Sequence, residues 1–274
     1  MRSVIMLIAI LVIAGIGFVG ALALALADRF LAVREDPRIG LVSAALPGAN
    51  CGGCGFPGCD GYARALVAGK AANGACAAGG AAVAAEIGRI LGIDAGSVSR
   101  RVAIVKCCGS RSETVRVGDY NGLCDCGLAA ATAGGDKGCR HGCLGYGACA
   151  NVCPQHAISV KDGLAKVEKR LCIGCGKCVS VCPRKVIELV PAEATIHVLC
   201  NNPVRGPEVR KVCGVGCMGC HLCEKNSGGK EANHFTFNGF LAKVNYENPP
   251  TDEQIVAKCP AKCMSVDPHF ETGH

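Results

Sequence analysis

The stretch Cys172-Ile-Gly-Cys-Gly-Lys-Cys-Val-Ser-Val-Cys-Pro183 decides how the C-terminal half of this chain folds. Its spacing, C-x2-C-x2-C-x3-C-P, holds iron–sulfur clusters in bacterial ferredoxins, where three close thiolates bind one cluster and the fourth binds another. Structural zinc sites usually consist of two C-x2-C pairs with a long spacer, so zinc is the less favoured alternative. The stretch therefore predicts a ferredoxin-like unit with two clusters that share ligands between two runs of cysteines.

The composition of the chain favours metal ligation over disulfides. The chain has 274 residues, of which 23 are cysteines. Disulfide frameworks are typical of short secreted chains, and an odd number of cysteines would leave one thiol unpaired. Aromatic residues make up 4% of the chain, with no tryptophan and 38 glycines, which indicates several small domains with clusters in their cores. We expect the net charge of +7 to offset cluster charge or to guide an acidic redox partner, and nothing indicates nucleic acid.

The N-terminal run Val4 to Ala27 has no charged residue and is long enough to span a bilayer. Ala25-Leu26-Ala27 resembles a cleavage site, but the run is too long for a typical signal peptide. Arg29, Arg34 and Arg38 follow it and predict that the rest of the chain is cytoplasmic. We therefore expect a single-pass anchor over residues 1–27 in the inner (cytoplasmic) membrane, in contact with membrane lipid.

A linker and a small four-cysteine module are expected over residues 28–92. The spacing C-x2-C-x4-C-x16-C is formed by Cys51, Cys54, Cys59 and Cys76. The first three lie in a glycine-rich loop that lets backbone amides approach sulfur. One helix is expected to begin within Tyr62 to Gly69, and another to cover Ala81 to Leu91. We predict one [4Fe–4S] cluster here, with zinc or free thiols as the alternatives.

A connecting region over residues 93–138, with a strand at Val102 to Val105, leads to a two-cluster ferredoxin-like domain over 139–190. In its first cysteine run the middle ligand position is occupied by Tyr146, a poor ligand, and Cys139 is the natural substitute. The predicted ligands of one cluster are Cys139, Cys143, Cys149 and Cys182, and those of the other are Cys153, Cys172, Cys175 and Cys178. A three-iron cluster that lacks one thiolate is the alternative for the first of them.

An internal repeat predicts a degenerate, one-cluster ferredoxin-like domain over residues 191–274. Val105-Lys-Cys107 followed by Cys139 resembles Val198-Leu-Cys200 followed by Cys213. The second copy keeps one complete ligand set, Cys217, Cys220, Cys223 and Cys259. The ligands of the other cluster are replaced by Ser227, Pro249, Asp252 and Ile255. Since all four losses belong to the same cluster, we expect the second copy to have lost one cluster and kept one.

The expected total is about four [4Fe–4S] clusters, with three or five as alternatives. The thiols left over are Cys107, Cys108, Cys124, Cys126, Cys200, Cys213 and Cys263. Buried free thiols behave as small apolar residues, which is the interpretation we prefer, although some of these could hold another centre. The predicted fold class is α+β, with an N-terminal transmembrane helix, a small [4Fe–4S] module and two ferredoxin-like βαβ repeats.

The chain resembles the B subunits of Rnf-type ion-translocating oxidoreductases over nearly its whole length. The residues that carry the resemblance are the N-terminal apolar run, Glu35-Asp-Pro-Arg38, Leu46 to Cys59, and His141 to Cys149. The resemblance implies an electron-transfer subunit that relays electrons from soluble ferredoxin, through its clusters, to membrane partners. In this family the complex couples electron flow between ferredoxin and NAD to the movement of sodium ions or protons.

No stand-alone catalytic site is expected in this chain. The seven histidines form no metal-ligand spacing, and no phosphate loop or nucleophile elbow is present. No motif binds NAD or flavin, so the resemblance implies that those sites lie on other subunits of the complex. The alternative function is a ferredoxin-like electron-transfer subunit of a membrane hydrogenase or dehydrogenase, which would not need the loop around Cys51.

Overall fold

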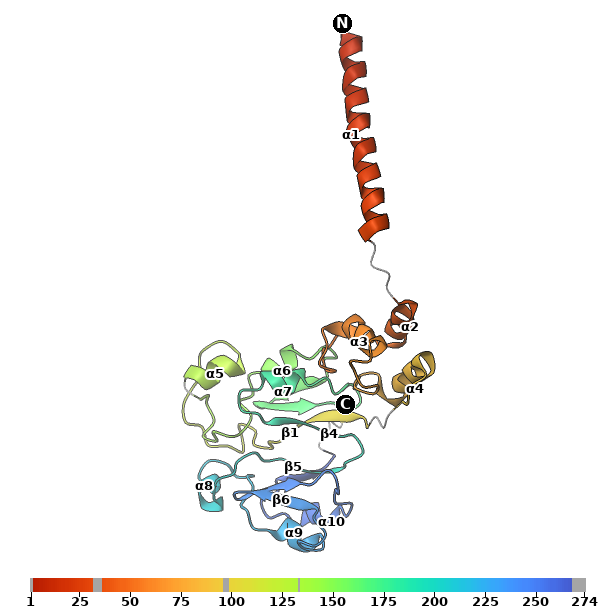
Figure 1. Ribbon diagram of the computed structural model, residues 1–274. Coiled ribbons are helices and arrows are strands. Elements are labelled where there is room, and N and C mark those ends of the chain that lie inside the picture. The colour runs from red at the N-terminus through yellow and green to blue at the C-terminus, as the bar shows by residue number, and fades with distance from the viewer. Residues whose placement is uncertain (1, 32–35, 96–98, 133, 268–274) are drawn as a thin grey trace.

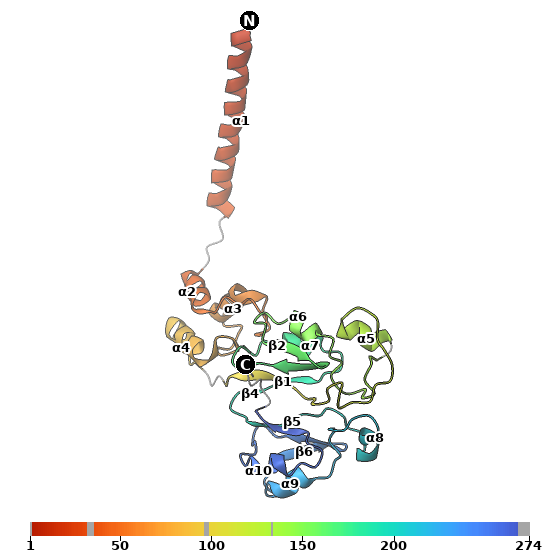
Figure 2. The same cartoon turned by 180° about the vertical axis from the view of Figure 1, so that it is seen from behind.

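The computed structural model describes residues 2–31, 36–95, 99–132 and 134–267. Helix α1 (Arg2–Leu31) stands apart from the rest of the chain, which forms a helical module above two small α+β units (Figure 1). The same three layers are seen from behind in Figure 2. The expected mixture of helices with small sheets is confirmed, and the following paragraphs take each layer in turn.

Helix α1 covers the whole apolar run that the sequence identifies. Within the residues that the structure describes, however, no helix meets the combined length and hydropathy needed to cross a membrane. The expected transmembrane anchor is therefore not confirmed. Arg34, one of the residues used to orient it, lies outside the described residues.

The helical module consists of α2 (Pro37–Ala45), α3 (Gly58–Val67) and α4 (Gly80–Leu91). Asp36 caps α2 by accepting a hydrogen bond from the backbone of Arg38, and a proline occupies the first helical position. Gly92 ends α4 in the left-handed conformation, at φ 68°, which a residue without a Cβ adopts at no steric cost. The helix expected over Ala81 to Leu91 is confirmed as α4, whereas the helix expected to begin within Tyr62 to Gly69 begins earlier, at Gly58. The apolar faces of the three helices share one core that includes Val42, Tyr62, Leu66 and Ile87.

The first ferredoxin-like unit contains β1 (Arg101–Val105), α6 (Ala148–Asn151), β2 (Ile158–Lys161), β3 (Leu164–Val167), α7 (Lys177–Val181) and β4 (Ile187–Pro191). Strand β1 pairs with β4, β2 pairs with β3, and both pairs are antiparallel. The strand expected at Val102 to Val105 is confirmed as part of β1. Because β1 closes the unit against β4, the region before residue 139 contributes a strand to the domain as well as a connection. Helix α5 (Cys126–Thr132) lies in the long loop that follows β1.

The second unit repeats this order with β5 (Ile196–Val198), α8 (Gly206–Arg210), α9 (Leu222–Asn226), β6 (Phe235–Asn238), β7 (Leu241–Val244), α10 (Gln254–Ala257) and β8 (Met264–Val266). Its strands pair as β5 with β8 and β6 with β7, again antiparallel. The described strands thus form no parallel βαβ crossover of the kind the sequence analysis expected. A tight hairpin in the middle of each unit reverses the chain, so the last strand returns beside the first in the opposite direction.

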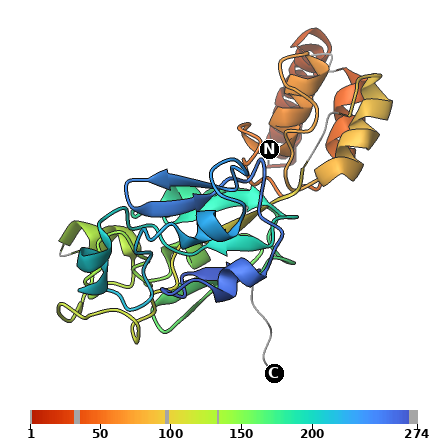
Figure 3. The same cartoon turned by 90° about the horizontal axis from the view of Figure 1, so that it is seen from below.

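The two units pack against each other along a seam (Figure 1), and Figure 3 shows the second unit from below, in front of the first. Val102, Ile104 and Val190 of the first sheet form a small core against Tyr246 of the second unit. The backbone amide of Cys108 donates a hydrogen bond to the carbonyl of Leu199 across the seam, at 3.1 Å. The seam therefore brings the segments that follow β1 and β5 side by side.

Candidate iron–sulfur sites

The four cysteines of the helical module lie together in the structure. Burial raises the pKa of the Cys76 thiol, and the neighbouring thiols of Cys54, Cys51 and Cys59 raise it further. Tyr62 holds the segment before Cys76, because its hydroxyl donates to the carbonyl of Ala72 at 2.9 Å and accepts from the amide of Ala75 at 3.2 Å. The structure thus brings together all the residues that the sequence assigned to this module.

A cavity in the first ferredoxin-like unit is lined by Cys153, Cys172, Cys175 and Cys178. Its other walls include the apolar side chains of Ala103, Ile158 and Leu189. The amides of Ala103 and Ala157 donate to the sulfurs of Cys172 and Cys153, each at 3.3 Å. Four thiols around an apolar space, with amides directed at sulfur, suit a cluster whose thiolates carry negative charge.

A second cavity, in the second ferredoxin-like unit, is lined by Cys217, Cys220, Cys223 and Cys259. Cys263 also lines it, with its sulfur 3.7 Å from that of Cys259. A hydrogen bond from the Cys263 side chain lowers the pKa of Cys259 and that of Cys217 below the ordinary value of a thiol. The hydrogen bond thus stabilises the thiolate form, which is the form that binds metal.

Ile255 occupies the position of a missing ligand in the second unit. Its side chain is 2% exposed and belongs to the apolar core of that unit. By the spacing of the cysteine runs it corresponds to Cys178 of the first unit. A branched apolar side chain thus fills space where the first unit has a thiol, which accords with the loss of one cluster.

The structure places Cys139 in a cavity at the seam between the two units, and Cys143 lines the same cavity. Burial raises the pKa of Cys149 to about 12, and the thiols that add to this rise are Cys143, Cys126, Cys178 and Cys182. Cys126, at the start of α5, also raises the pKa of Cys143, although burial is the larger cause. Cys126 thus lies with Cys143, Cys149 and Cys182, three members of the ligand set that the sequence predicted. Cys139 instead faces the seam between the two units.

Sequence reasoning left Cys126 unassigned because no regular spacing connects it to the other ligands. The sequence feature that could have pointed to Cys126 is Tyr146. Because a tyrosine occupies the middle ligand position of the first cysteine run, the missing thiol has to come from another segment of the chain. The ring of Tyr120 lies 5.0 Å from that of Tyr146, so the loop that leads to α5 folds back over this position. Cys124, two residues before Cys126, is exposed.

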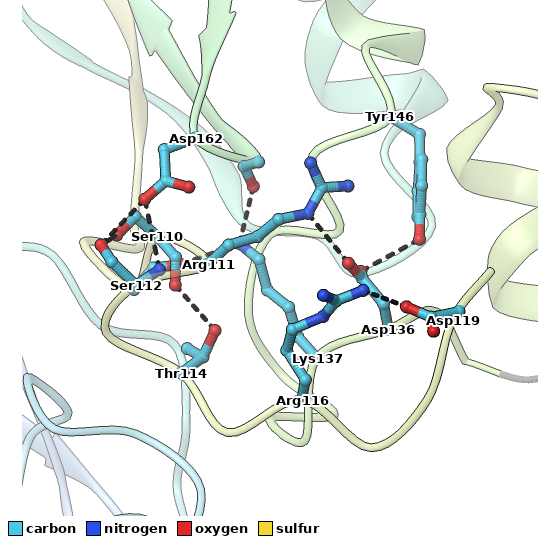
Figure 4. Close-up of polar contacts among 12 residues, drawn as sticks. Ser110, Arg111, Ser112, Thr114, Arg116, Asp119, Asp136, Lys137, Tyr146 and Asp162 are labelled. Carbon is cyan, nitrogen blue, oxygen red and sulfur yellow. Dashed lines mark hydrogen bonds and ion pairs between the residues drawn. The ribbon is translucent and has the colours of Figure 1, made fainter.

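A polar network fixes the loop between α5 and the first ferredoxin run (Figure 4). Burial opposes ionisation of Asp136, but hydrogen bonds from Arg111 and Tyr146 hold its pKa below the usual value. The Tyr146 hydroxyl donates to the carboxylate at 3.0 Å and Arg111 Nε donates at 2.9 Å. Tyr146 is therefore a structural anchor in this unit, and its hydroxyl is committed to Asp136.

The N-terminal module touches the first ferredoxin-like unit next to two of these sites. A Cβ added at Gly53, in the loop between Cys51 and Cys54, would lie 3.0 Å from the carbonyl oxygen of Cys175. Only a glycine allows this approach, so the two cysteine loops are in backbone contact.

No three His, Cys, Asp or Glu side chains of the described residues converge as closely as one metal ion requires. A cubane cluster sets its four thiolates farther apart, because each thiolate binds from outside to one of the four irons, which alternate with sulfide at the corners of the cube. None of the 23 cysteines forms a disulfide in the described structure.

Comparison with known proteins identifies similar domains and relatives. Residues 46–78 match a family model described as a putative Fe–S cluster, and residues 139–193 match the LdpA Fe–S cluster-binding domain.

The chain is 43% identical over 270 residues to the B subunit of the Na⁺-translocating ferredoxin:NAD⁺ oxidoreductase complex of Acetobacterium woodii, a match that covers 97% of this chain and 80% of the relative. It is 37% identical over 265 residues to the B subunit of the ion-translocating oxidoreductase complex of Methanosarcina acetivorans, with 96% and 99% covered. The B subunit of the proton-translocating ferredoxin:NAD⁺ oxidoreductase complex of Clostridium ljungdahlii is 40% identical over 219 residues, 79% of this chain and 76% of the relative.

Replacement of Cys126 tests which thiol completes the set around Cys143 and Cys149. We expect Cys126→Ala to convert one [4Fe–4S] cluster into a [3Fe–4S] cluster, because three thiolates remain, and so to lose about one iron per chain. The measurement is the EPR spectrum of the oxidised protein together with its iron content. Cys124→Ala removes an exposed thiol two residues away and should leave both unchanged. An unaltered Cys126→Ala protein would return this ligand position to Cys139.

Proposed function

The chain belongs to the family of B subunits of ion-translocating oxidoreductase complexes, and from this premise we propose that it is the iron–sulfur electron-transfer subunit of such a complex. The observation that carries the proposal is the succession of cysteine-lined sites from the helical module to the second ferredoxin-like unit. The proposed [4Fe–4S] ligand sets are Cys51, Cys54, Cys59 and Cys76; Cys153, Cys172, Cys175 and Cys178; Cys126, Cys143, Cys149 and Cys182; and Cys217, Cys220, Cys223 and Cys259.

A [4Fe–4S] cluster, when bound, takes up and releases one electron at a time. The protein controls this chemistry through the surroundings of the sulfurs. Amides such as those of Ala103 and Ala157 point at ligand sulfurs and favour the more negative, reduced state. The apolar walls around the sites exclude water, and the backbone contact between Gly53 and Cys175 brings two neighbouring sites close together.

Reduced ferredoxin is the proposed electron donor, and the second ferredoxin-like unit is its proposed docking surface. Cys220 is an exposed cysteine of its ligand set, so this site lies near the protein surface. Lys225, Lys258 and Lys262 are exposed and lie within three residues of Cys223 or Cys259. Their positive charge would attract an acidic redox partner and accelerate its association. NAD chemistry is assigned to other subunits of the complex.

Membrane association through α1 completes the proposal. The uncharged run Val4 to Ala27 supports it, as do exposed apolar side chains such as Ile13 (71% exposed), Phe18 (70%) and Leu24 (74%). Side chains of this kind are unfavourable in water at such density. The many free thiols favour a reducing compartment, so the cluster-bearing part is proposed to lie on the cytoplasmic side.

Metal and sulfide analysis of the anaerobically purified full chain tests the central proposal. We expect about sixteen or more irons per chain with equivalent acid-labile sulfide, and EPR signals of interacting reduced clusters after dithionite treatment. Stoichiometric zinc with little iron, in protein made under iron-replete conditions, would leave the cysteines a structural role.

Charge reversal near Cys259 tests the docking surface. We expect Lys258→Glu with Lys262→Glu to slow reduction by ferredoxin about tenfold at low ionic strength, because two attractive charges become repulsive. The difference should shrink as salt screens the charges. Lys70→Glu, an exposed charge reversal in the helical module, is the matched control. Equal rates for all three proteins in stopped-flow measurements would place the docking surface elsewhere.

Removal of residues 1–31 tests membrane association. Because the exposed apolar side chains of α1 are lost, we expect the shortened chain to move from the washed membrane fraction to the soluble fraction while it keeps its iron. The measurement is immunoblotting with iron analysis of both fractions. A shortened chain that stays on membranes lacking the other subunits would show that α1 is not the attachment.

A further inference from the structure

A third cysteine-lined cavity lies at the seam between the two ferredoxin-like units. The cysteines that line it are Cys107, Cys108, Cys139, Cys143, Cys200 and Cys213. Apart from Cys143, none of them belongs to a ligand set assigned above.

Four of these thiols are related by the internal repeat. Cys107 and Cys200 follow the first strand of their units at the same distance, and Cys139 and Cys213 precede the ferredoxin runs by the same spacing. The amide of Cys217 donates to the sulfur of Cys200 at 3.3 Å. In the first unit, burial raises the pKa of Cys107 to about 12 and a hydrogen bond from the amide of Cys143 opposes the rise. Each unit thus contributes an equivalent pair of thiols, held by an equivalent amide.

The sulfurs converge on one space. A Cβ at Gly142 would lie 3.4 Å from the sulfur of Cys107 and 3.4 Å from that of Cys139. A Cβ at Gly109 would lie 3.3 Å from the sulfur of Cys213 and 3.8 Å from that of Cys107. Larger residues at these glycines would crowd the thiols.

Cys200 belongs to the same group. Burial raises the pKa of its thiol to about 11, and among its neighbours the thiols of Cys217 and Cys139 add to the rise. Cys139 in turn accepts a hydrogen bond from the side-chain amide of Asn202, two residues after Cys200, at 3.7 Å. Asn202 is 5% exposed, so a buried donor points at one of these sulfurs.

The backbone around residue 115 ties the two halves of the site together. The amide of Gly138 donates to the carbonyl of Val115 at 2.7 Å, and the amide of Val115 donates to the carbonyl of Val212 at 3.1 Å. The backbone of Val115 is therefore bonded both to the residue before Cys139 and to the residue before Cys213. These hydrogen bonds fix the distance between the backbone segments that carry Cys139 and Cys213.

A buried cation borders the cavity. Lys137 is 4% exposed, and its ammonium donates to the carbonyls of Gly109 at 2.8 Å and Gly163 at 2.6 Å (Figure 4). These carbonyl oxygens carry no full negative charge that would balance the ammonium. The carboxylate of Asp162 interacts with Lys137, but Asp162 is exposed. A buried charge is costly unless an opposite charge lies nearby. Thiolates bound to a cluster would supply that negative charge.

We propose that Cys107, Cys139, Cys200 and Cys213 hold a further [4Fe–4S] cluster at the seam, with two ligands from each ferredoxin-like unit. Cys108 lines the same cavity, but it corresponds to Asn201 in the second copy, and its thiol donates to the carbonyl of Val215 at 3.4 Å. Cys108 is therefore a partly buried thiol and not a ligand. If the proposed function holds, this cluster joins the sites of the two units into one continuous route for electrons.

The double variant Cys139→Ala/Cys213→Ala, compared with Cys108→Ala in the full anaerobically prepared chain, tests the site. We expect the double variant to lose about four irons and four sulfides relative to the unsubstituted chain. Cys108→Ala should retain the full content. Wild-type iron in the double variant, equal losses in both variants, or zinc bound in place of the lost iron would each overturn the proposal. A chain without any iron would instead refute the proposed function.

A milder substitution covers the case in which the double variant fails to fold. Cys139→Ala alone leaves three thiolates, so we expect an oxidised [3Fe–4S] EPR signal that the unsubstituted chain lacks and a loss of about one iron. Addition of Cys126→Ala should then produce a second such signal, because the two cysteines serve different clusters. A folded Cys139→Ala protein without the new signal would refute the assignment.

Discussion

Thiols crowded together in an apolar interior are the constraint on which this structure depends. Burial is the main cause that raises the pKa of Cys107, Cys149 and Cys178 to about 12, and neighbouring thiols contribute to each rise. Such groups are neutral without metal, and their ionisation requires positive charge close by. Iron supplies that charge and fills the space between the sulfurs. The small cores, the short helices and the scarcity of aromatic residues are understandable when clusters occupy the middle of each domain.

The two ferredoxin-like units share a scaffold, but the second has an apolar side chain where the first has one of these buried thiols. Leu164-Ala-Lys-Val167 recurs as Leu241-Ala-Lys-Val244, and the strands pair in the same order in both units. Yet α10 carries buried Ile255 where α7 carries Cys178. An apolar side chain can fill this position because the hairpin and the outer strands provide the rest of the scaffold in both units. The fold thus accommodates either a thiol or an apolar side chain at this position.

Local patterns allowed much of this structure to be predicted from the sequence. Helix α4 was predictable from an apolar period ended by Gly92, and β1 from a short β-branched run. The thiols of Cys172, Cys175 and Cys178 gather around one cavity because their spacing wraps a single loop. The positions of Cys126 and Cys139 were not predictable in this way. They depend on the pairing of β1 with β4 and on the Tyr120–Tyr146 contact, which connect segments distant in sequence.

The order of the sites in space follows the order of the chain, and this has a consequence for electron flow. The helical module meets the first unit at Gly53 and Cys175, and the first unit meets the second at the seam near Cys139 and Cys213. The helical module and α1 lie at one end of this series, and the second unit, which carries exposed Cys220, lies at the other. Electron transfer falls off steeply with separation, so a linear series of contacts favours a single path over several parallel ones. The site proposed at the seam would draw one pair of cysteines from each unit, Cys107 with Cys139 and Cys200 with Cys213, at equivalent positions of the internal repeat.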